Sequence, residues 1–181
     1  MNPFNNPQID IDGLPEAEEL SYQGLEPSYR SVLLISNTIL FLIIGIGLGT
    51  AFYNIDEDIP RFFKIAIPIV YSTLLILSFL SIIFGFKNKL FAIREMDLNY
   101  KKGWLWKSRM VVPFKRIQHS EVTQGPIDRL FDLAKLKVYT AGGSGSDLTI
   151  PGLKQFEADK LKMLITSRIT KKAVANGREE E

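Results

Sequence analysis

The sequence predicts an α+β membrane protein in which a hairpin of two transmembrane helices precedes a β-rich domain that ends in an α-helix. Three observations predict this class: two long uncharged stretches, then short runs rich in β-branched and aromatic residues, and last a segment with apolar residues at helical spacing. We expect the β-rich domain to be a partly open barrel, capped by the C-terminal helix.

The chain begins with an acidic leader, residues 1–31, which has six carboxylates against one base and a net charge of −5. Its prolines and its small number of aromatic residues predict that it is partly disordered, chiefly over residues 1–20. The acidic residues are Asp10, Asp12, Glu16, Glu18, Glu19 and Glu26.

Two uncharged stretches, residues 32–52 and 65–86, predict a transmembrane hairpin over residues 32–86. A helix of about 21 residues measures about 31 Å, which matches a hydrocarbon core of about 30 Å. A secretory signal peptide is the alternative for the first stretch, but a signal core is shorter, at roughly 7 to 15 residues, and follows a basic leader.

Small residues at four-residue spacing lie in both spans: Gly45 with Gly49, and Ser81 with Gly85. This spacing lets two helices approach closely, so these four residues are candidates for helix packing within the hairpin or with a partner. The alternative is that these residues mark no contact, because glycine is common in membrane helices in general.

The flanking charges predict the orientation. The loop between the spans carries Asp56, Glu57 and Asp58, whereas lysines and arginines crowd the exit of the second span. The positive-inside rule therefore places that exit, and with it both termini, in the cytoplasm. The bases are Lys87, Lys89, Arg94, Lys101 and Lys102.

The cytoplasmic domain is expected over residues 87–172, followed by a charged tail over residues 173–181. A helix is predicted from about Leu153. The glycine- and serine-rich residues 141–146 could be a phosphate loop, but they lack the following Lys-Ser/Thr pair and precede a strand, which favours a hairpin loop. Strands are predicted at 90–94, 98–102, 108–113, 117–124, 135–140 and 147–150.

The residue content argues against disulfides, a metal site and catalysis. The chain has no cysteine and one histidine, His119, which excludes a disulfide framework and the usual zinc ligand sets. Neither a nucleophile with its base nor a motif of paired carboxylates is found, so we expect no catalytic residue, no cofactor and no enzyme activity.

A basic and aromatic group near the second span is the best candidate surface for anionic lipids or a partner. The alternative is that these residues form solvated strand faces, with one tryptophan in the core. Nucleic acid could use similar residues, but a membrane tether and a modest charge disfavour it. The group comprises Lys101, Lys102, Trp104, Trp106, Lys107, Arg109, Lys115 and Arg116.

Two segments together, Val-Pro-Phe-Lys-Arg-Ile-Gln-His at 112–119 and Gln-Gly-Pro-Ile-Asp-Arg at 124–129, give the chain a specific resemblance. Over residues 32 to about 170 it resembles the membrane-anchored bacterial pleckstrin-homology (PH) family of the YdbS type. The resemblance implies a bacterial plasma membrane, and two membrane helices followed by a PH-like barrel of about seven strands with a C-terminal helix. The acidic leader is not part of that pattern.

Three functions are compatible with this sequence. The first is a non-enzymatic, membrane-anchored scaffold that assembles with itself or with another membrane protein, because PH-like folds serve as binding platforms without shared chemistry. The second is a sensor of anionic lipid headgroups. The third is an accessory subunit of a transport or envelope-stress system, although the spans lack the ionisable residues of a transport pathway.

Overall fold

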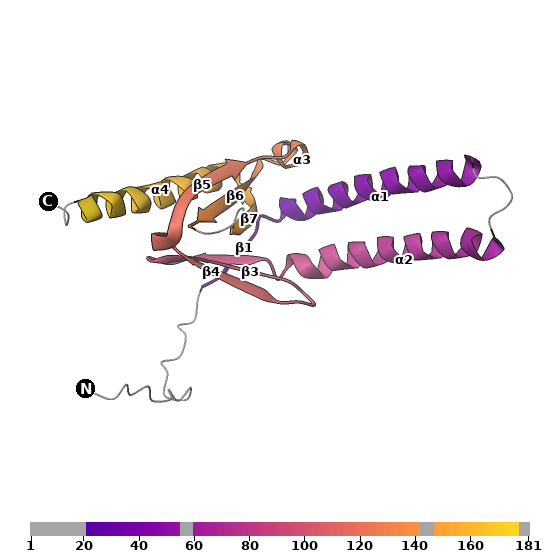
Figure 1. The fold of residues 1–181 in the computed structure, drawn as a ribbon, viewed down its shortest axis with the longest axis horizontal. Coiled ribbons are helices and arrows are strands. Elements are labelled where there is room, and N and C mark those ends of the chain that lie inside the picture. Colours follow the sequence, from indigo (N-terminus) through magenta and orange to yellow (C-terminus); the bar gives the residue numbers. More distant parts are fainter. Residues whose placement is uncertain (1–20, 55–59, 142–146, 178–181) are drawn as a thin grey trace, which may run out of the picture.

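The computed structural model describes residues 21–54, 60–141 and 147–177, with side chains up to residue 170. The expected disorder of residues 1–20, the loop acids at 56–58 and most of the 141–146 loop lie outside these ranges. Two long helices run side by side from one end of a domain made of strands and shorter helices (Figure 1).

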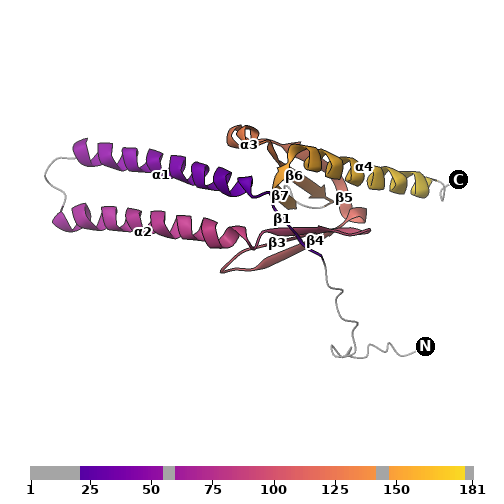
Figure 2. The same ribbon diagram turned by 180° about the vertical axis from the view of Figure 1, so that it is seen from behind.

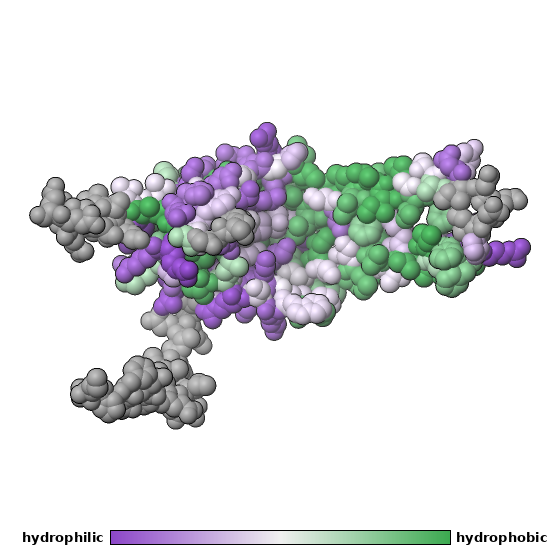
Figure 3. Space-filling model, viewed as in Figure 1, coloured by the Kyte–Doolittle hydropathy of each residue, from purple (hydrophilic) through white to green (hydrophobic). Residues whose placement is uncertain are grey.

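The two helices are α1, Ser28–Asn54, and α2, Arg61–Phe86. Both are long and apolar enough to cross a membrane, and both predicted spans lie within them. Hardly any of their side chains is buried, so the apolar surface faces outward. On the face that Figure 3 shows, hydrophobic residues predominate along the hairpin with weakly polar residues between them, whereas the domain is largely hydrophilic.

Polar side chains join the two helices inside the apolar hairpin. The Tyr71 hydroxyl donates a hydrogen bond of 2.7 Å to the carbonyl oxygen of Phe41, and the Ser78 hydroxyl donates one of 2.6 Å to the Asn37 side chain. Because hydrocarbon offers no other partners, such bonds hold the helices in one register.

The domain contains two antiparallel sheets. The first has the order β1-β2-β3-β4 and the second the order β5-β6-β7. A 3-10 turn at Phe114–Arg116 connects them. The strands are β1 Gln23–Gly24, β2 Leu90–Ile93, β3 Asp97–Lys102, β4 Ser108–Pro113, β5 Ile117–Thr123, β6 Leu133–Thr140 and β7 Leu148–Lys154.

Among the described strands, no backbone pairing joins one sheet to the other. The prediction of strands followed by a final helix is therefore confirmed, but closure into a barrel is not. The two inner faces still share one core, which includes Leu98 and Val112 from the first sheet and Leu136 and Ile150 from the second.

Helix α4, Gln155–Gly177, packs on the second sheet and runs away from the membrane hairpin (Figures 1 and 2). Leu153 belongs to β7, so the helix begins two residues later than expected. Its inward face carries Ala158 and Ile165, both nearly fully buried, whereas Phe156 points outward with 65% of its surface exposed.

The last residues of the acidic leader belong to the domain. Strand β1 pairs with β2, and the N–H of Glu26 donates a 3.0 Å hydrogen bond to the carbonyl oxygen of Gly152. Leu25, Tyr29 and Val32 are buried in the core between the sheets. The first membrane helix is therefore joined to the domain through its first turn, which the sequence did not indicate.

Candidate functional site

The turn between β3 and β4 is an apolar tip beside the membrane helices. Gly103, at φ 106°, makes the turn, and a Cβ there would overlap the carbonyl group of Trp106. The Trp104 ring stacks on Phe84 near the end of α2, with centroids 5.2 Å apart. Leu105 and Trp106 are 69% and 83% exposed. Three large apolar side chains thus lie beside the end of α2 that adjoins the domain.

A second apolar point lies at the same end of the domain, beside the other membrane helix. The short helix α3, Pro126–Leu130, contacts the start of α1 (Figures 1 and 2). Leu130 at its end is 80% exposed. Sequence reasoning missed Leu130, because a single leucine after Arg129 has no periodic signal.

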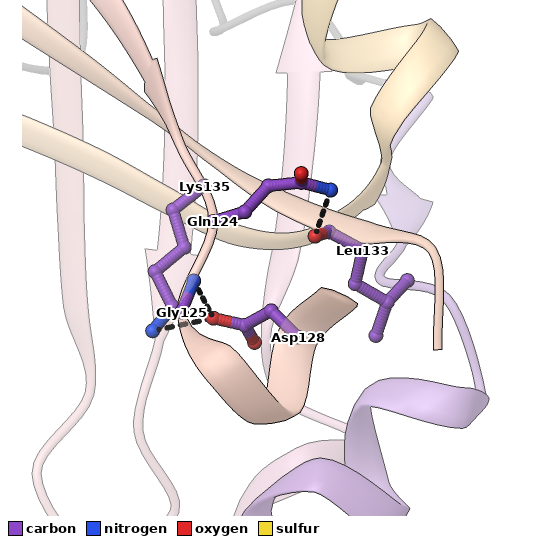
Figure 4. Close-up of polar contacts among 5 residues, drawn as sticks. All are labelled: Gln124, Gly125, Asp128, Leu133 and Lys135. Atoms are coloured by element: carbon purple, nitrogen blue, oxygen red, sulfur yellow. Dashed lines mark hydrogen bonds and ion pairs between the residues drawn. The ribbon is translucent and has the colours of Figure 1, made fainter. Parts of the chain in front are cut away.

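A buried carboxylate holds α3 in place (Figure 4). Asp128, only 2% exposed, accepts a hydrogen bond of 3.1 Å from the Gly125 N–H and lies 3.0 Å from Lys135 Nζ. The side chain of Gln124 donates a 2.9 Å bond to the carbonyl oxygen of Leu133. The Gln-Gly-Pro-Ile-Asp-Arg segment therefore has a structural role: it fixes α3 against β6.

The structure divides the predicted basic group. Lys101 and Arg109 lie opposite each other on β3 and β4, and each cation is 5.9 Å from the ring of Tyr22. Lys102 lines a cleft, and Lys107 lies in the tip turn. Within the described ranges, none of these four bases forms an ion pair with a carboxylate.

Lys115 and Arg116 are separated from the rest of the group. They lie in the 3-10 turn that follows β4. Strand β4 has six residues and spans about 20 Å, so it separates this turn from the tip. Near the 3-10 turn, Asp147 accepts hydrogen bonds of 2.7 and 2.6 Å from the Thr140 N–H and hydroxyl. These bonds, together with the charge of Arg116, hold the pKa of Asp147 below its usual value.

A cleft opens between the edge strand β4 and the second sheet. One part, of about 290 Å³, is lined by Met110, Val112, Arg116 and Asp147 among others. A second part, of about 210 Å³, reaches Tyr100 and Leu148. The cleft follows from the missing backbone pairing between the sheets, which strand prediction cannot reveal.

Lys89 stands between the membrane helices and the domain. Its ammonium group is 5.5 Å from the centroid of the Tyr29 ring. Burial lowers its pKa, and the positive charge of Lys102 lowers it further. Lys89 and Lys102 therefore lie close enough to repel each other at the end of the domain next to the two helices.

The four candidate packing residues of the membrane helices differ in their surroundings. A Cβ on Gly45 would lie 2.9 Å from the Tyr71 hydroxyl, so Gly45 makes room for the hairpin contact. Gly49 and Gly85 have no described atom near a Cβ position, and Ser81 is exposed. Packing of these three residues against a second copy or partner stays a prediction.

In the described part of the chain, no cluster of three or more His, Cys, Asp or Glu side chains could hold a metal ion. The arrangement is a surface: an apolar tip, a second apolar point at Leu130, and beside the tip four bases that form no ion pair with a described carboxylate.

Comparison with known proteins gives the family. The chain is 33% identical over 82 residues to the UPF0699 transmembrane protein YdbS of Bacillus subtilis (strain 168), which covers 44% of this chain and 50% of that protein. The chain thus spans about half the length of this curated relative. No solved structure matches significantly. The family model described as Bacterial PH domain matches residues 32–169, so the chain belongs to the bacterial PH domain family.

Proposed function

We propose that this protein is a non-enzymatic, membrane-anchored PH-like module whose β3–β4 hairpin sits in the headgroup layer of the inner leaflet. The stacking of Trp104 on Phe84 carries this proposal, because it joins the hairpin tip to the membrane end of α2. Tryptophan is favoured at that depth, where its ring meets the acyl boundary and its N–H meets water.

Energetics favour the same placement. Complete burial of a leucine side chain stabilises by about 1.5 to 3 kcal/mol, so partial insertion of Leu105 and Trp106 contributes on the order of 1 kcal/mol each. A base close to anionic headgroups adds about 1 kcal/mol. Lys101, Lys107 and Arg109, which lack a described carboxylate partner, can supply that contribution.

The orientation follows from the charges. Bases flank the exit of α2 and acids occupy the loop between the helices, so the domain and both termini lie in the cytoplasm of a bacterium with the hairpin in its plasma membrane. The relative in Bacillus subtilis is named a transmembrane protein, which supports the location in a membrane but does not bear on the orientation.

The tip supplies its own probe, because Trp104 and Trp106 are the only tryptophans in the chain. The full chain is reconstituted in nanodiscs that contain anionic lipids brominated at defined acyl positions. We expect strong quenching of tryptophan fluorescence by the shallow bromines. The control carries Trp104→Phe, Trp106→Phe and Phe156→Trp, which moves the probe to exposed α4, and should show little quenching. Equal quenching in both chains would exclude the proposed position of the β3–β4 hairpin in the headgroup layer.

A protein scaffold is the second candidate, and the open edge of β4 favours it. Met110 and Val111 are exposed there, beside the cleft to the second sheet. An unpaired edge strand can accept an extended segment of another protein. Three kinds of partner fit this edge: a second copy of the chain, another membrane protein, or a transport or envelope-stress complex. Identification of the bound protein distinguishes them.

The scaffold is tested by crosslinking in native membranes, followed by purification and identification of stoichiometric partners. Val111→Lys should abolish recovery of a partner that binds the β4 edge. Met163→Lys, on exposed α4, is the matched control and should leave recovery unchanged. Recovery of lipid alone, without a stoichiometric protein, contradicts the scaffold function.

A further inference from the structure

The outer face of the first sheet presents positive charge that the described residues leave uncompensated. Lys101 and Arg109 lie side by side there, in contact with Tyr22. Of the six lysines and arginines in residues 98–120, these two lie beside Tyr22, whereas Lys102 lines the cleft and the other three lie in the turns at either end of β4. A surface of this kind binds an anionic partner.

The chain carries a complementary segment next to this surface. Residues 1–20 contain five carboxylates and no lysine or arginine. Tyr22 is held over the two bases, because the next two residues form β1. Glu16, Glu18 and Glu19 precede Tyr22 by only three to six residues, and an extended chain of six residues reaches about 21 Å. Their carboxylates therefore stay at high effective concentration near the bases.

The Tyr22 side chain offers a further contact. Its hydroxyl is buried and has no hydrogen-bond partner among the described residues. A buried hydroxyl without a partner is unfavourable, and a carboxylate is an acceptor that fits a site beside two cations.

We propose that the acidic segment at residues 10–19 docks on the outer face of the first sheet, against Lys101 and Arg109. Docked there, it occupies bases that would otherwise face anionic headgroups, so it weakens the contact of the hairpin with the membrane. This second consequence rests on the proposed lipid function, whereas the docking does not.

The docking is tested by cysteine crosslinking. Because the sequence has no native cysteine, the two introduced residues carry the only thiols that can react. Glu18→Cys is paired with Val111→Cys, two residues along β4 from Arg109 and on the same face, in nanodiscs of neutral lipid. The matched control pairs Glu18→Cys with Lys162→Cys on α4. We expect intramolecular crosslinking to residue 111 to be several-fold faster than to residue 162.

Salt and charge provide the second readout. The advantage of residue 111 should disappear near 1 M salt, where the Debye length is about 3 Å, and should shrink when Arg109→Gln is added. Equal rates for the two pairs overturn the docking. Crosslinked dimers overturn it as well, because they assign the surface to the leader of a second copy.

The consequence for lipids has its own test. In nanodiscs with brominated anionic lipid, the chain carrying Asp10→Asn, Asp12→Asn, Glu16→Gln, Glu18→Gln and Glu19→Gln should show stronger tryptophan quenching than the unaltered chain. Equal, strong quenching refutes the competition. An absence of quenching in both chains instead refutes the lipid function, and the crosslinking result still decides the docking.

Discussion

At the scale of single residues, Gly152 is the point at which the membrane hairpin meets the domain. It has φ +63°, and a Cβ there would overlap the ring of Tyr29 in the first turn of α1. We expect Gly152→Ala to destabilise the protein by about 2 kcal/mol or more, from left-handed backbone strain and displacement of the ring. Thermal unfolding in detergent measures this. Gly24→Ala, with open space around its Cβ position, is the control and should change the unfolding temperature little.

Asp128 gives a second prediction, because it is buried and bonded to both Gly125 and Lys135. Asp128→Ala should reduce the free energy of unfolding by about 1 to 3 kcal/mol, since it leaves the Gly125 N–H without its partner. Asp159→Ala, at an exposed position of α4, should be nearly neutral. A neutral Asp128→Ala would show that α3 is held by other contacts.

Asp147 predicts a dependence on pH. Its pKa is lowered in the folded state by the two hydrogen bonds from Thr140, so its contribution to stability is present above the unfolded pKa and is lost as pH falls through the folded one. Asp147→Asn should therefore lower the unfolding temperature at neutral pH, and the difference from the unaltered chain should shrink below about pH 4. A difference that stays constant down to pH 2 would contradict this assignment.

At the scale of elements, the hairpin and most of the strands could be predicted from local patterns. Which elements pair or pack against one another could not. The uncharged stretches indicate α1 and α2 because charge is excluded from hydrocarbon. Gly103 between two alternating runs indicates the β3–β4 turn. Strand β1 has only two residues and no pattern, so its pairing depends on contacts distant in sequence. For the same reason, the separation of Arg116 from Arg109 was not visible in the sequence.

The packing of α1 on α2 gives a prediction at this scale. Gly45→Val would collide with the Tyr71 hydroxyl and break its bond to Phe41, so we expect a loss of stability of about 0.5 to 2 kcal/mol. Gly49→Val places the same side chain in open space within the monomer. Unfolding of both variants in detergent, together with their oligomeric state, separates two uses of these glycines. Loss of an oligomer in Gly49→Val alone would assign Gly49 to a second copy.

At the scale of the whole molecule, the membrane hairpin and the domain are one folding unit. A division at residue 86, natural from the sequence, separates the two sheets from Leu25, Tyr29 and Val32 in their core. Burial of these three side chains contributes roughly 5 to 9 kcal/mol, which is comparable with the total stability of a small domain, about 5 to 15 kcal/mol.

We therefore predict that residues 87–181 alone do not form the packed domain in water. Their NMR spectrum should lack the dispersion of a folded core, and they should bind a hydrophobic dye. A chain in which residues 21–32 are joined to residue 87 by a flexible linker restores β1 and the three core side chains, and should fold cooperatively. The same chain with Leu25→Ala and Tyr29→Ala is the control, because it keeps the length but not the packing. Cooperative unfolding of the fragment without residues 21–32 would show that the two sheets and α4 suffice, and that the membrane hairpin is joined to the domain without supporting it.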